Sequence, residues 1–279
     1  MNRIYILLAT YNGTKYLEEQ INSILNQTYE NWKLIIHDDN SNDNSVSIIK
    51  EYSKKYPNKI KLIDDSIATG GAKENFTYLL YHIDDNFDYI MFADQDDVWL
   101  KNKIEITLDK MLKIEQKNYN KPILIHTDLK VVDKELDIIS ESMFKYQKLN
   151  ISNQYNLERI SLENIVTGCT MMINKSLSLK VKYIPKEAIM HDWWFAIITL
   201  RDEGIISMVR ESTILYRQHE LNTIGSQEIN LFYYVKKFFN LKKNVKNYID
   251  IYQQYKRANI SIKIYKLIFM KFSMILKKF

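Results

Sequence analysis

The sequence predicts an α/β fold in which a mainly parallel, Rossmann-like sheet is sandwiched by helices and followed by a basic helical extension. Short apolar runs alternate with helical patterns over the first 130 residues, as is typical of parallel strands joined by helices. With 6 Gly and 3 Pro in 279 residues, little of the chain is suited to linkers. Residues 231–279 carry a net charge of +11 and the remainder carries −6, so an acidic body precedes a basic tail.

The expected elements follow from the spacing of apolar residues. Strands are expected over residues 4–9, 32–37, 60–63, 89–93 and 123–126, with helices over 16–25, 42–56, 74–82 and 101–116. After Asp137 the alternation ends. A strand is then expected over 169–174, a helix over 192–201 and a pair of strands over 205–209 and 213–216, followed by helix from residue 231 onward.

The composition favours a globular cytoplasmic protein. Hydrophobic residues make up 46% of the chain, and the single Cys169 excludes an internal disulfide framework, as expected in a reducing compartment. The N-terminal apolar run is short for a signal peptide, and no stretch of about 18 apolar residues predicts a membrane span.

Polar residues gather where the predicted strands end. Sheets of this kind bind ligands at the carboxyl ends of their strands. Four of the five strand ends are acidic, and the five clusters are Thr10-Tyr11-Asn12, Asp38-Asp39, Asp64-Asp65, Asp94-Gln95-Asp96-Asp97 and His126-Thr127-Asp128. One edge of the sheet is therefore the expected binding site.

Asp94 and Asp96 form a D-x-D triplet directly after a hydrophobic strand. Two carboxylates on such a turn can hold Mg²⁺ or Mn²⁺ and leave other coordination positions to phosphate oxygens. A lone D-x-D is more often a solvated turn, but its place at the strand end, with a second acidic pair nearby, favours the metal.

The segment from Asp38 to Asp43 follows another strand and precedes a helix. Capping and turn formation are the expected role of Asp43. A buried carboxylate at Asp38 or Asp39 could instead accept a hydrogen bond from the imide of uracil or thymine.

The order and spacing of several motifs identify a family. They are Ala9-Thr10-Tyr11-Asn12-Gly13, Leu17-Glu18-Glu19-Gln20-Ile21, Ile24-Leu25-Asn26-Gln27-Thr28-Tyr29, Asp38-Asp39-x-Ser41-x-Asp43 and Ala93-Asp94-Gln95-Asp96-Asp97-Val98-Trp99. Together they resemble family 2 of the inverting glycosyltransferases, which has the GT-A fold. The resemblance covers about residues 1–225. Where that family commonly has glycine, this chain has Asn40, which also tolerates the left-handed conformation.

The resemblance implies two halves and a tail. Residues 1–227 would form the catalytic domain, with 1–130 binding the nucleotide and 131–227 the acceptor, and 228–279 would be a basic amphipathic tail. Donor contacts are expected from the first-strand and D-x-D motifs, with Asp94 meeting the ribose and Asp96 the metal. The further donor contacts are Thr10, Tyr11, Asn12, Asp39 and Gln95.

Two further motifs are expected to meet phosphate. Gly70-Gly71-Ala72-Lys73 matches the family's glycine-containing helix start, where backbone amides and Lys73 could bind phosphate; a plain glycine-rich helix start is the alternative. Arg217 can pair with diphosphate, and His219 can be a metal ligand or a phosphate contact, although a lone histidine is usually structural.

Asp192 matches the family's acid at the start of a helix facing the acceptor. It is the expected general base, and one in-line displacement needs no covalent nucleophile. A helix N-cap is the alternative role, and one carboxylate can do both. Acceptor contacts are expected from Trp99, Gly168, His191 and Trp193. Core packing is expected for at least one of Trp193 and Trp194, and Cys169 is expected to be a small buried residue rather than a nucleophile.

The motifs around His191 and Arg217 are most similar to rhamnosyltransferase-type members. They imply dTDP-rhamnose as donor, with a hexose from a UDP-sugar as the alternative. A hydroxyl of a surface-glycan precursor, free or polyprenol-linked, is the expected acceptor. The tail interleaves Lys with aromatic and aliphatic residues, which favours an anionic membrane surface on the inner face of the cell membrane. The alternatives for the tail are nucleic-acid binding and a pair of helices that docks onto a partner protein. Of these two, we do not expect binding to nucleic acid.

Two rival functions use similar residues. A nucleotidyltransferase usually has a glycine-rich basic loop after its first strand, and Thr10-Tyr11-Asn12-Gly13 is not one. A non-catalytic nucleotide-sugar binder would be expected to lack Asp96 or Asp192, and both are present. A glycosyltransferase is therefore the predicted function.

Overall fold

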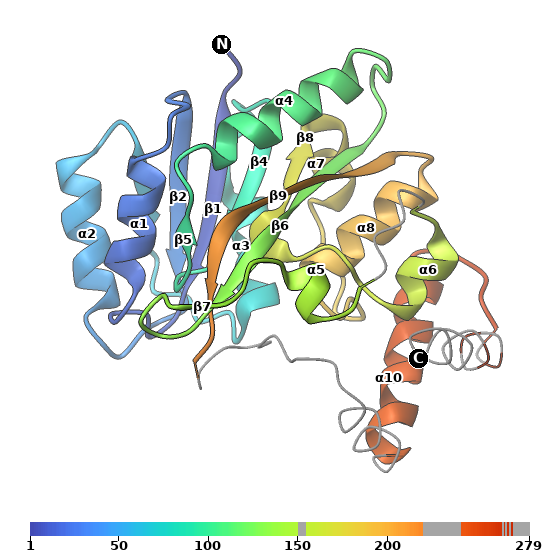
Figure 1. Cartoon of the computed structure of the whole chain (residues 1–279). Helices are drawn as coiled ribbons and strands as arrows, with labels where there is room; N and C mark the ends of the chain where they lie inside the picture. Colours follow the sequence, from blue (N-terminus) through green and yellow to red (C-terminus); the bar gives the residue numbers. More distant parts are fainter. Residues whose placement is uncertain (150–154, 220–240, 264, 266, 268, 270–279) are drawn as a thin grey trace.

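The computed structural model describes residues 1–149, 155–219, 241–263, 265, 267 and 269, and it has a mixed sheet between helical layers (Figure 1). Within these residues the strand order is β3-β2-β1-β4-β8-β6-β9-β5, and β7 pairs with β6. The strands are β1 (Ile4–Thr10), β2 (Trp32–Asp38), β3 (Ile60–Ile63), β4 (Tyr89–Ala93), β5 (Val98–Trp99), β6 (Ile123–Val132), β7 (Ile138–Ser140), β8 (Met172–Asn174) and β9 (Ile205–Arg217).

The first half of the sheet is parallel, as predicted. β1 pairs in parallel with both β2 and β4, and β2 pairs in parallel with β3. The second half is mixed, because β8 runs antiparallel to β4 and β6 while β9 runs parallel to β6. In the register of β1 and β2, Thr10 lies opposite Asp38, so two of the predicted polar strand ends meet at one edge.

Alternating side chains build one apolar core on each face of the sheet. Tyr5 and Leu7 of β1 join the core that includes residues of α3 (Ala72–His82), α7 (Lys175–Val181) and α8 (His191–Arg201). Ile4, Ile6 and Leu8 join the core that includes residues of α1 (Leu17–Leu25), α2 (Ser45–Lys55) and α4 (Lys103–Glu115). This period of two is the reason why strands buried on both faces read as continuous apolar runs.

Shorter helices complete the second half of the molecule. They are α5 (Met143–Tyr146), α6 (Leu157–Leu162) and the 3₁₀ turn η1 (Gly168–Thr170). η1 occupies the first part of the strand expected over 169–174, which leaves only Met172–Asn174 as β8.

Two strand predictions are corrected. The strand expected over 123–126 continues to Val132, and the two strands expected at 205–209 and 213–216 are one strand, β9. Polar residues caused both errors, because they resemble the ends of strands in the sequence. These residues are Thr127 and Asp128 in β6 and the Arg210–Ser212 segment in β9. The sheet accommodates them with register shifts between Thr127 and Lys130, and Thr127 bonds to Thr213 across the strands at 2.6 Å.

The described part of the tail packs on the second half of the catalytic body. Helix α10 (Leu241–Arg257) places Ile251 and Tyr255 in the same core as Ile160 of α6 and Phe195 of α8 (Figure 1). The expected boundary at residue 227 and much of the expected 228–279 tail lie outside the described residues. Among the described residues, no helix is both long and apolar enough to cross a membrane.

Candidate functional site

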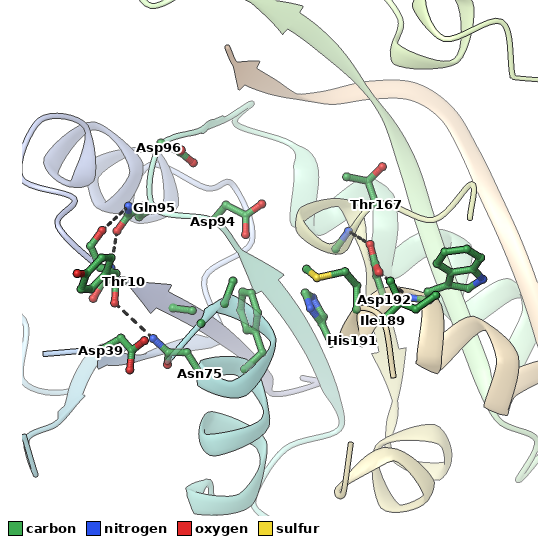
Figure 2. A pocket seen from close by; sticks show the side chains of 18 of the residues that line it. Thr10, Asp39, Asn75, Asp94, Gln95, Asp96, Thr167, Ile189, His191 and Asp192 are labelled. Carbon is green, nitrogen blue, oxygen red and sulfur yellow. Dashed lines mark hydrogen bonds between the residues drawn. The ribbon is translucent and has the colours of Figure 1, made fainter. Parts of the chain in front are cut away.

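A cleft of about 1010 Å³ opens at the edge where the strands of the first half end. Figure 2 shows Thr10, Asp39, Asn75 and the D-x-D turn on one side, and Thr167, Ile189, His191 and Asp192 on the other. Of the single residues expected to contact donor, metal or acceptor, ten line this cleft: Thr10, Tyr11, Asp39, Asp94, Gln95, Asp96, Gly168, His191, Asp192 and Trp193. Gly70, Gly71 and Ala72 of the expected phosphate-binding helix start line it as well. Segments distant in the sequence thus meet around one cavity, of a size usual for small-molecule sites.

The two carboxylates of the Asp38-Asp39 pair have different roles. Asp38 accepts from Thr10 Oγ1 at 2.8 Å and from the backbone N–H of Ser41 at 2.7 Å, so it stabilises the turn. Asp39 lines the cleft and accepts from the backbone N–H groups of Thr69 and Gly70. Asp39, and not Asp38, is therefore the carboxylate available to a ligand.

Asp43 caps the following turn, as predicted. It accepts from Ser45 Oγ at 2.5 Å and from the Thr14 N–H at 3.1 Å. Burial alone would raise the pKa of Asp43, but the hydrogen bonds from Ser45 and Thr14 lower this pKa to about 2. Asn40 has φ 60°, the left-handed conformation in which asparagine can replace glycine.

Gln95, the middle residue of the D-x-D triplet, joins that turn to the end of β1. Its Oε1 accepts from the Tyr11 N–H at 2.8 Å, and its Nε2 donates to the Tyr11 carbonyl at 2.9 Å. A Cβ on Gly13 would approach Gln95 Oε1 to 2.4 Å, so glycine allows this contact. Asn12 does not line the cleft; its side chain accepts from the Asn42 N–H at 2.9 Å and connects two loops.

Asn75 is a cleft residue to which the sequence analysis gave no role. From α3, its Nδ2 donates to the carbonyls of Thr10 and His37, and its Oδ1 bonds to His37 Nδ1 at 2.8 Å. His37 Nε2 in turn lies 3.3 Å from Asp65 Oδ1. The only signal in the sequence was an amide within an otherwise apolar helix face.

The D-x-D turn concentrates negative charge. Burial, and then the nearby Asp96 and Asp192, raise the pKa of Asp94 to about 7. Beneath the turn, burial raises the pKa of Asp97 and of the Cys169 thiol well above their usual values. Cys169 is 1% exposed, in agreement with its predicted structural role.

His219 and Arg217 both attach to Asp96, but in different ways. His219 Nε2 lies 2.8 Å from Asp96 Oδ2, so the two residues expected as metal ligands are in direct contact. Arg217 is 2% exposed and donates to the Asp96 carbonyl, the Lys134 carbonyl and Glu19. The expected diphosphate contact is not what this arrangement shows, because Arg217 is outside the cleft lining and fixes the D-x-D backbone.

Lys73 and Trp99 also lie outside the cleft lining. Lys73 Nζ donates to the carbonyls of Ala188 at 2.9 Å and Lys186 at 3.2 Å, and it pairs with Glu74, so in this structure its bonds go to the loop before α8. Trp99 is 2% exposed in the core, with Lys103 Nζ 4.7 Å from its ring centroid. The expected acceptor contact at Trp99 is therefore not met, because the side chain is packed inside.

The cleft wall opposite the D-x-D turn is centred on Asp192, in the first turn of α8. Its Oδ1 accepts from the Trp193 N–H at 2.5 Å and its Oδ2 from the Gly168 N–H at 3.1 Å. Burial raises the pKa of Asp192 to about 7, although these hydrogen bonds act in the opposite direction. A carboxylate with such a pKa is suited to proton transfer near neutral pH.

His191 lies beside Asp192 against Phe76, with ring centroids 4.4 Å apart. It is 3% exposed, and neither ring nitrogen has a hydrogen-bond partner among the described residues. Burial lowers its pKa to about 3, so the imidazole is neutral. A Cβ on Gly168 would lie 2.7 Å from its Nε2, so the ring needs glycine there.

The two tryptophans lie in different environments, and one of them is in the core, as expected for at least one of the two. Trp194 is in the core, while Trp193 lines the cleft and donates from Nε1 to the Ile160 carbonyl at 2.7 Å. The predicted strand end His126-Thr127-Asp128 is instead buried within β6, where Asp128 accepts from Ser142 Oγ at 2.5 Å, so it plays no part in the cleft.

The residues at the D-x-D turn fit a hard divalent cation. Carboxylate oxygens are the donors that hard cations prefer, whereas imidazole is better suited to softer metals. After burial, the negative charges of Asp96 and Asp192 raise the pKa of Asp94, and a cation would neutralise that charge. Asp94, Asp97 and Cys169 each bring a possible ligand atom within 4.8 Å of the others, but Asp97 and Cys169 are buried and the thiol stays protonated. The Asp96–His219 pair is the better holder, because Asp96 lines the cleft.

The sequence matches a known family model. The model of Glycosyl transferase family 2 matches residues 5–178, which include β1, the D-x-D turn and the Gly168 loop. The dTDP-rhamnosyl transferase RfbG of Shigella flexneri is 30% identical over 230 residues, which are 78% of this chain and 74% of that protein. The UDP-Glc:alpha-D-GlcNAc-diphosphoundecaprenol beta-1,3-glucosyltransferase WfgD of Escherichia coli is 27% identical over 72% of this chain and 71% of its own.

Solved structures with low sequence identity share the fold. S. aureus TarS 1-349 in complex with UDP-GlcNAc has a TM-score of 0.59 at 19% identity, covering 95% of this chain and 69% of its own. The mannosyltransferase PcManGT from Pyrobaculum calidifontis, in complex with GDP-Man and Mn²⁺, has a TM-score of 0.55 at 14% identity, covering 99% of this chain and 81% of its own. The architecture around the cleft is thus of the GT-A type.

Proposed function

This chain belongs to glycosyl transferase family 2, and we propose that it moves a sugar from a nucleotide diphosphate to a hydroxyl of a surface-glycan precursor, with inversion at the anomeric carbon. One observation carries the proposal. Asp192 faces the D-x-D turn across a single cleft, close enough that its charge contributes to the raised pKa of Asp94 (Figure 2). A base and a diphosphate site on opposite walls are what an in-line displacement requires.

The donor nucleotide occupies the side formed by the strand ends. Asp39 accepts from a nucleobase imide; a carboxylate has about four acceptor positions, so its bonds to the Thr69 and Gly70 amides leave capacity for another donor. Tyr11, half-exposed at the cleft, and Asn75 below it border the base and ribose. Asp94 is the ribose contact.

Asp96, with His219, would hold Mg²⁺ or Mn²⁺. A cation held there would supply positive charge to the diphosphate leaving group. Arg217 contributes indirectly, because its bond to the Asp96 carbonyl at 3.0 Å keeps the D-x-D backbone in place. The Mn²⁺ in the PcManGT complex supports this assignment.

Asp192 takes the proton of the acceptor hydroxyl as its oxygen attacks the anomeric carbon. The backbone N–H groups of Gly168 and Trp193 orient the carboxylate, and its pKa of about 7 allows it to accept a proton at neutral pH. Because the attack is direct, the chain needs no covalent nucleophile, and the configuration inverts.

The donor sugar is rhamnose from dTDP-rhamnose, with a hexose from a UDP-sugar as the alternative. The name of the Shigella relative supports the first choice and that of the Escherichia relative the second. The latter name also supports an acceptor linked through diphosphate to a polyprenol. Gly168, His191 and Trp193 surround that acceptor.

A lipid-linked acceptor agrees with an anionic membrane surface as a partner of the tail. α10 buries Ile251 and Tyr255, while Val245 and Ile249 are exposed on it together with Lys246 and Lys256. Exposed apolar residues flanked by lysine are typical of interfacial helices. The protein would then work at the inner face of the cell membrane.

Thermal unfolding in the presence of nucleotide sugars tests the function. With Mn²⁺, dTDP-rhamnose or a UDP-hexose is expected to raise the unfolding midpoint by mass action, and dTDP or UDP released in the presence of a GlcNAc-diphosphate-lipid acceptor reports transfer. NMR of the product determines the anomeric configuration. Retention of configuration, or stabilisation by no nucleotide sugar, would contradict the proposal.

A further inference from the structure

The backbone immediately before Asp192 is held from two sides. The loop of residues 182–190 connects α7 to α8, and its last two residues, Ile189 and Met190, line the cleft. From the donor half, Lys73 donates to the carbonyls of Ala188 and Lys186. From the tail, Gln254 accepts from the Ile189 N–H at 2.8 Å. The loop is thus fixed by residues that are far from it in the sequence.

Gln254 is placed unusually for a glutamine. It is 0% exposed, and its Nε2 has no hydrogen-bond partner among the described residues. An unsatisfied buried amide is destabilising, and an apolar side chain of similar length would avoid that penalty. What Gln254 provides in return is the acceptor oxygen for the part-buried Ile189 N–H, which an apolar side chain at position 254 would leave without this partner.

The position of the loop determines where Asp192, the proposed base, lies, because the loop leads directly into α8. Met190 is the N-cap of α8, and its carbonyl accepts the first helical hydrogen bond, from the Trp194 N–H at 3.0 Å. His191 and Asp192 form the first turn, and no side chain caps this helix start. A displaced Ile189 would therefore shift Met190 and, with it, the positions of His191 and Asp192 relative to the cleft.

We propose that Gln254 is a positioning residue for the acceptor end of the cleft: it fixes Ile189 so that α8 presents His191 and Asp192 to the acceptor. The inference rests on the proposed function of Asp192 and assigns a catalytic consequence to a helix outside the matched family segment of residues 5–178. It also connects the helix with exposed lysines to the acceptor site through one hydrogen bond.

Neighbouring Tyr255 offers a matched control. It is also 0% exposed on α10, but its hydroxyl donates to the Leu157 carbonyl of α6 at 2.8 Å and forms no hydrogen bond with the described residues of the loop. Tyr255→Phe therefore removes one buried hydrogen bond of the same helix without releasing Ile189. Gln254→Met removes the acceptor oxygen at similar volume, and Gln254→Glu keeps an acceptor oxygen.

The experiment measures transfer from dTDP-rhamnose or UDP-glucose to a GlcNAc-diphosphate-lipid, together with the affinity for dTDP or UDP by calorimetry. Gln254→Met should lower kcat/KM for the acceptor on the order of 10-fold or more, since small misplacements near the reacting atoms have such effects. Nucleotide affinity should stay unchanged, Gln254→Glu should recover much of the loss, and Tyr255→Phe should leave the acceptor KM as in the wild type.

Hydrogen exchange separates this inference from the proposed function. The Ile189 amide and the amides of His191 to Trp193 should exchange faster in Gln254→Met and not in Tyr255→Phe. Equal effects of Gln254→Met and Tyr255→Phe on transfer, or unchanged exchange at Ile189, would overturn the positioning role. If the wild type transferred no sugar, the proposed function would fall, and exchange at His191–Trp193 alone would decide whether Gln254 sets this turn.

Discussion

The two ends of the cleft differ in how their polar groups are satisfied. At the donor end the groups bond to one another: Thr10 donates to Asp38, Gln95 exchanges two hydrogen bonds with Tyr11, and Asp39 accepts from two backbone amides. At the proposed acceptor end, both ring nitrogens of His191 lack partners among the described residues. A raised carboxylate pKa of about 7 is common to both ends, at Asp192 and at Asp94.

This difference in hydrogen bonding matches the two tasks that we propose for the two ends, which are nucleotide binding and proton transfer. A donor end whose hydrogen bonds are already formed is preorganised and loses little freedom when a nucleotide binds. An acceptor end with an unpartnered buried imidazole is destabilising in the free protein, and under the proposed function the acceptor would supply the missing partners. Destabilised groups of this kind are expected where activity and stability compete.

The largest expected effect is at Asp96. Asp96→Asn should abolish turnover while the protein stays folded, because a carboxylate ligand of the cation is lost. Activity with Mg²⁺ or Mn²⁺, compared with EDTA, measures it. Asp133→Asn, which alters a carboxylate in the turn before β7, should retain activity. Full wild-type activity in EDTA would remove the metal from the proposal.

Asp192→Asn tests the acceptor end directly. Transfer should fall by about 10²–10⁴ because general-base assistance is lost, whereas nucleotide affinity should be nearly unchanged since the donor end is intact. Calorimetry gives the affinity and product release gives the rate. Near-normal transfer by this variant would mean that the base lies elsewhere on the cleft wall.

Two glycines sharpen the comparison, one at each end. A Cβ at position 168 would lie 2.7 Å from the His191 ring, which contacts Phe76, Phe92 and Phe195. Overpacking of this kind costs about 1–3 kcal/mol, so Gly168→Ala should weaken acceptor use about tenfold or more.

Gly13→Ala should have the smaller effect and act on nucleotide affinity. Its Cβ would meet Gln95 Oε1 at 2.4 Å, but that atom is the end of a flexible side chain and can move at the cost of its bonds to Tyr11. Acceptor KM and nucleotide Kd of both variants are the measurements. Should Gly13→Ala impair acceptor use more than Gly168→Ala does, the division between the two ends would be wrong.

Charge reversal on α10 tests the membrane proposal without removing the helix, since deletion would expose the core that Ile251 and Tyr255 fill. Attraction to an anionic surface is worth about 1 kcal/mol per basic residue, so Lys246→Glu with Lys256→Glu should reduce co-sedimentation with anionic vesicles, most strongly at low salt. Lys113→Glu with Lys117→Glu, in and just after α4 on the other side of the molecule, has the same net charge (Figure 1). Equal losses in the two double variants would argue against a membrane-facing α10.

The smallest expected effect is a gain in the stability of the Asp192→Asn variant over the wild type, a gain that depends on pH. Below the unfolded pKa of 3.8, Asp192 is protonated in both states and contributes no pH dependence. Between 3.8 and about 7 only the unfolded state ionises, so wild-type stability falls as the pH rises, and above 7 the penalty is complete. Asp192→Asn should therefore unfold at a higher temperature than the wild type at pH 8 and show a smaller difference at pH 4, in EDTA. A difference that grows toward acid would contradict the raised pKa.

Much of the fold was predictable because its signals are local. The strand at 89–93 was predicted with the observed bounds because it is a continuous run of buried apolar residues. The strand at 60–63 also has the observed bounds, although only Ile60 is buried and Lys61 is exposed. β9 was not predicted as one strand, because the polar Arg210–Ser212 segment is tolerated only where β6 lies beside it with shifted register. The spacing of residues along residues 205–217 does not reveal that β6 will lie beside them.

The candidate site follows the same division. The sequence by itself determined which chemical groups lie at the strand ends, because the chain must end each buried strand at the same edge of a parallel sheet. Only the tertiary structure decided which of them face the cleft: Asp39 does while Asp38 fixes a turn, and Arg217 and Lys73 bond to backbone carbonyls. The physical reason is that long polar side chains bond to the nearest available partners, and those partners, such as Glu19 for Arg217 and Ile189 for Gln254, are brought near only by folding.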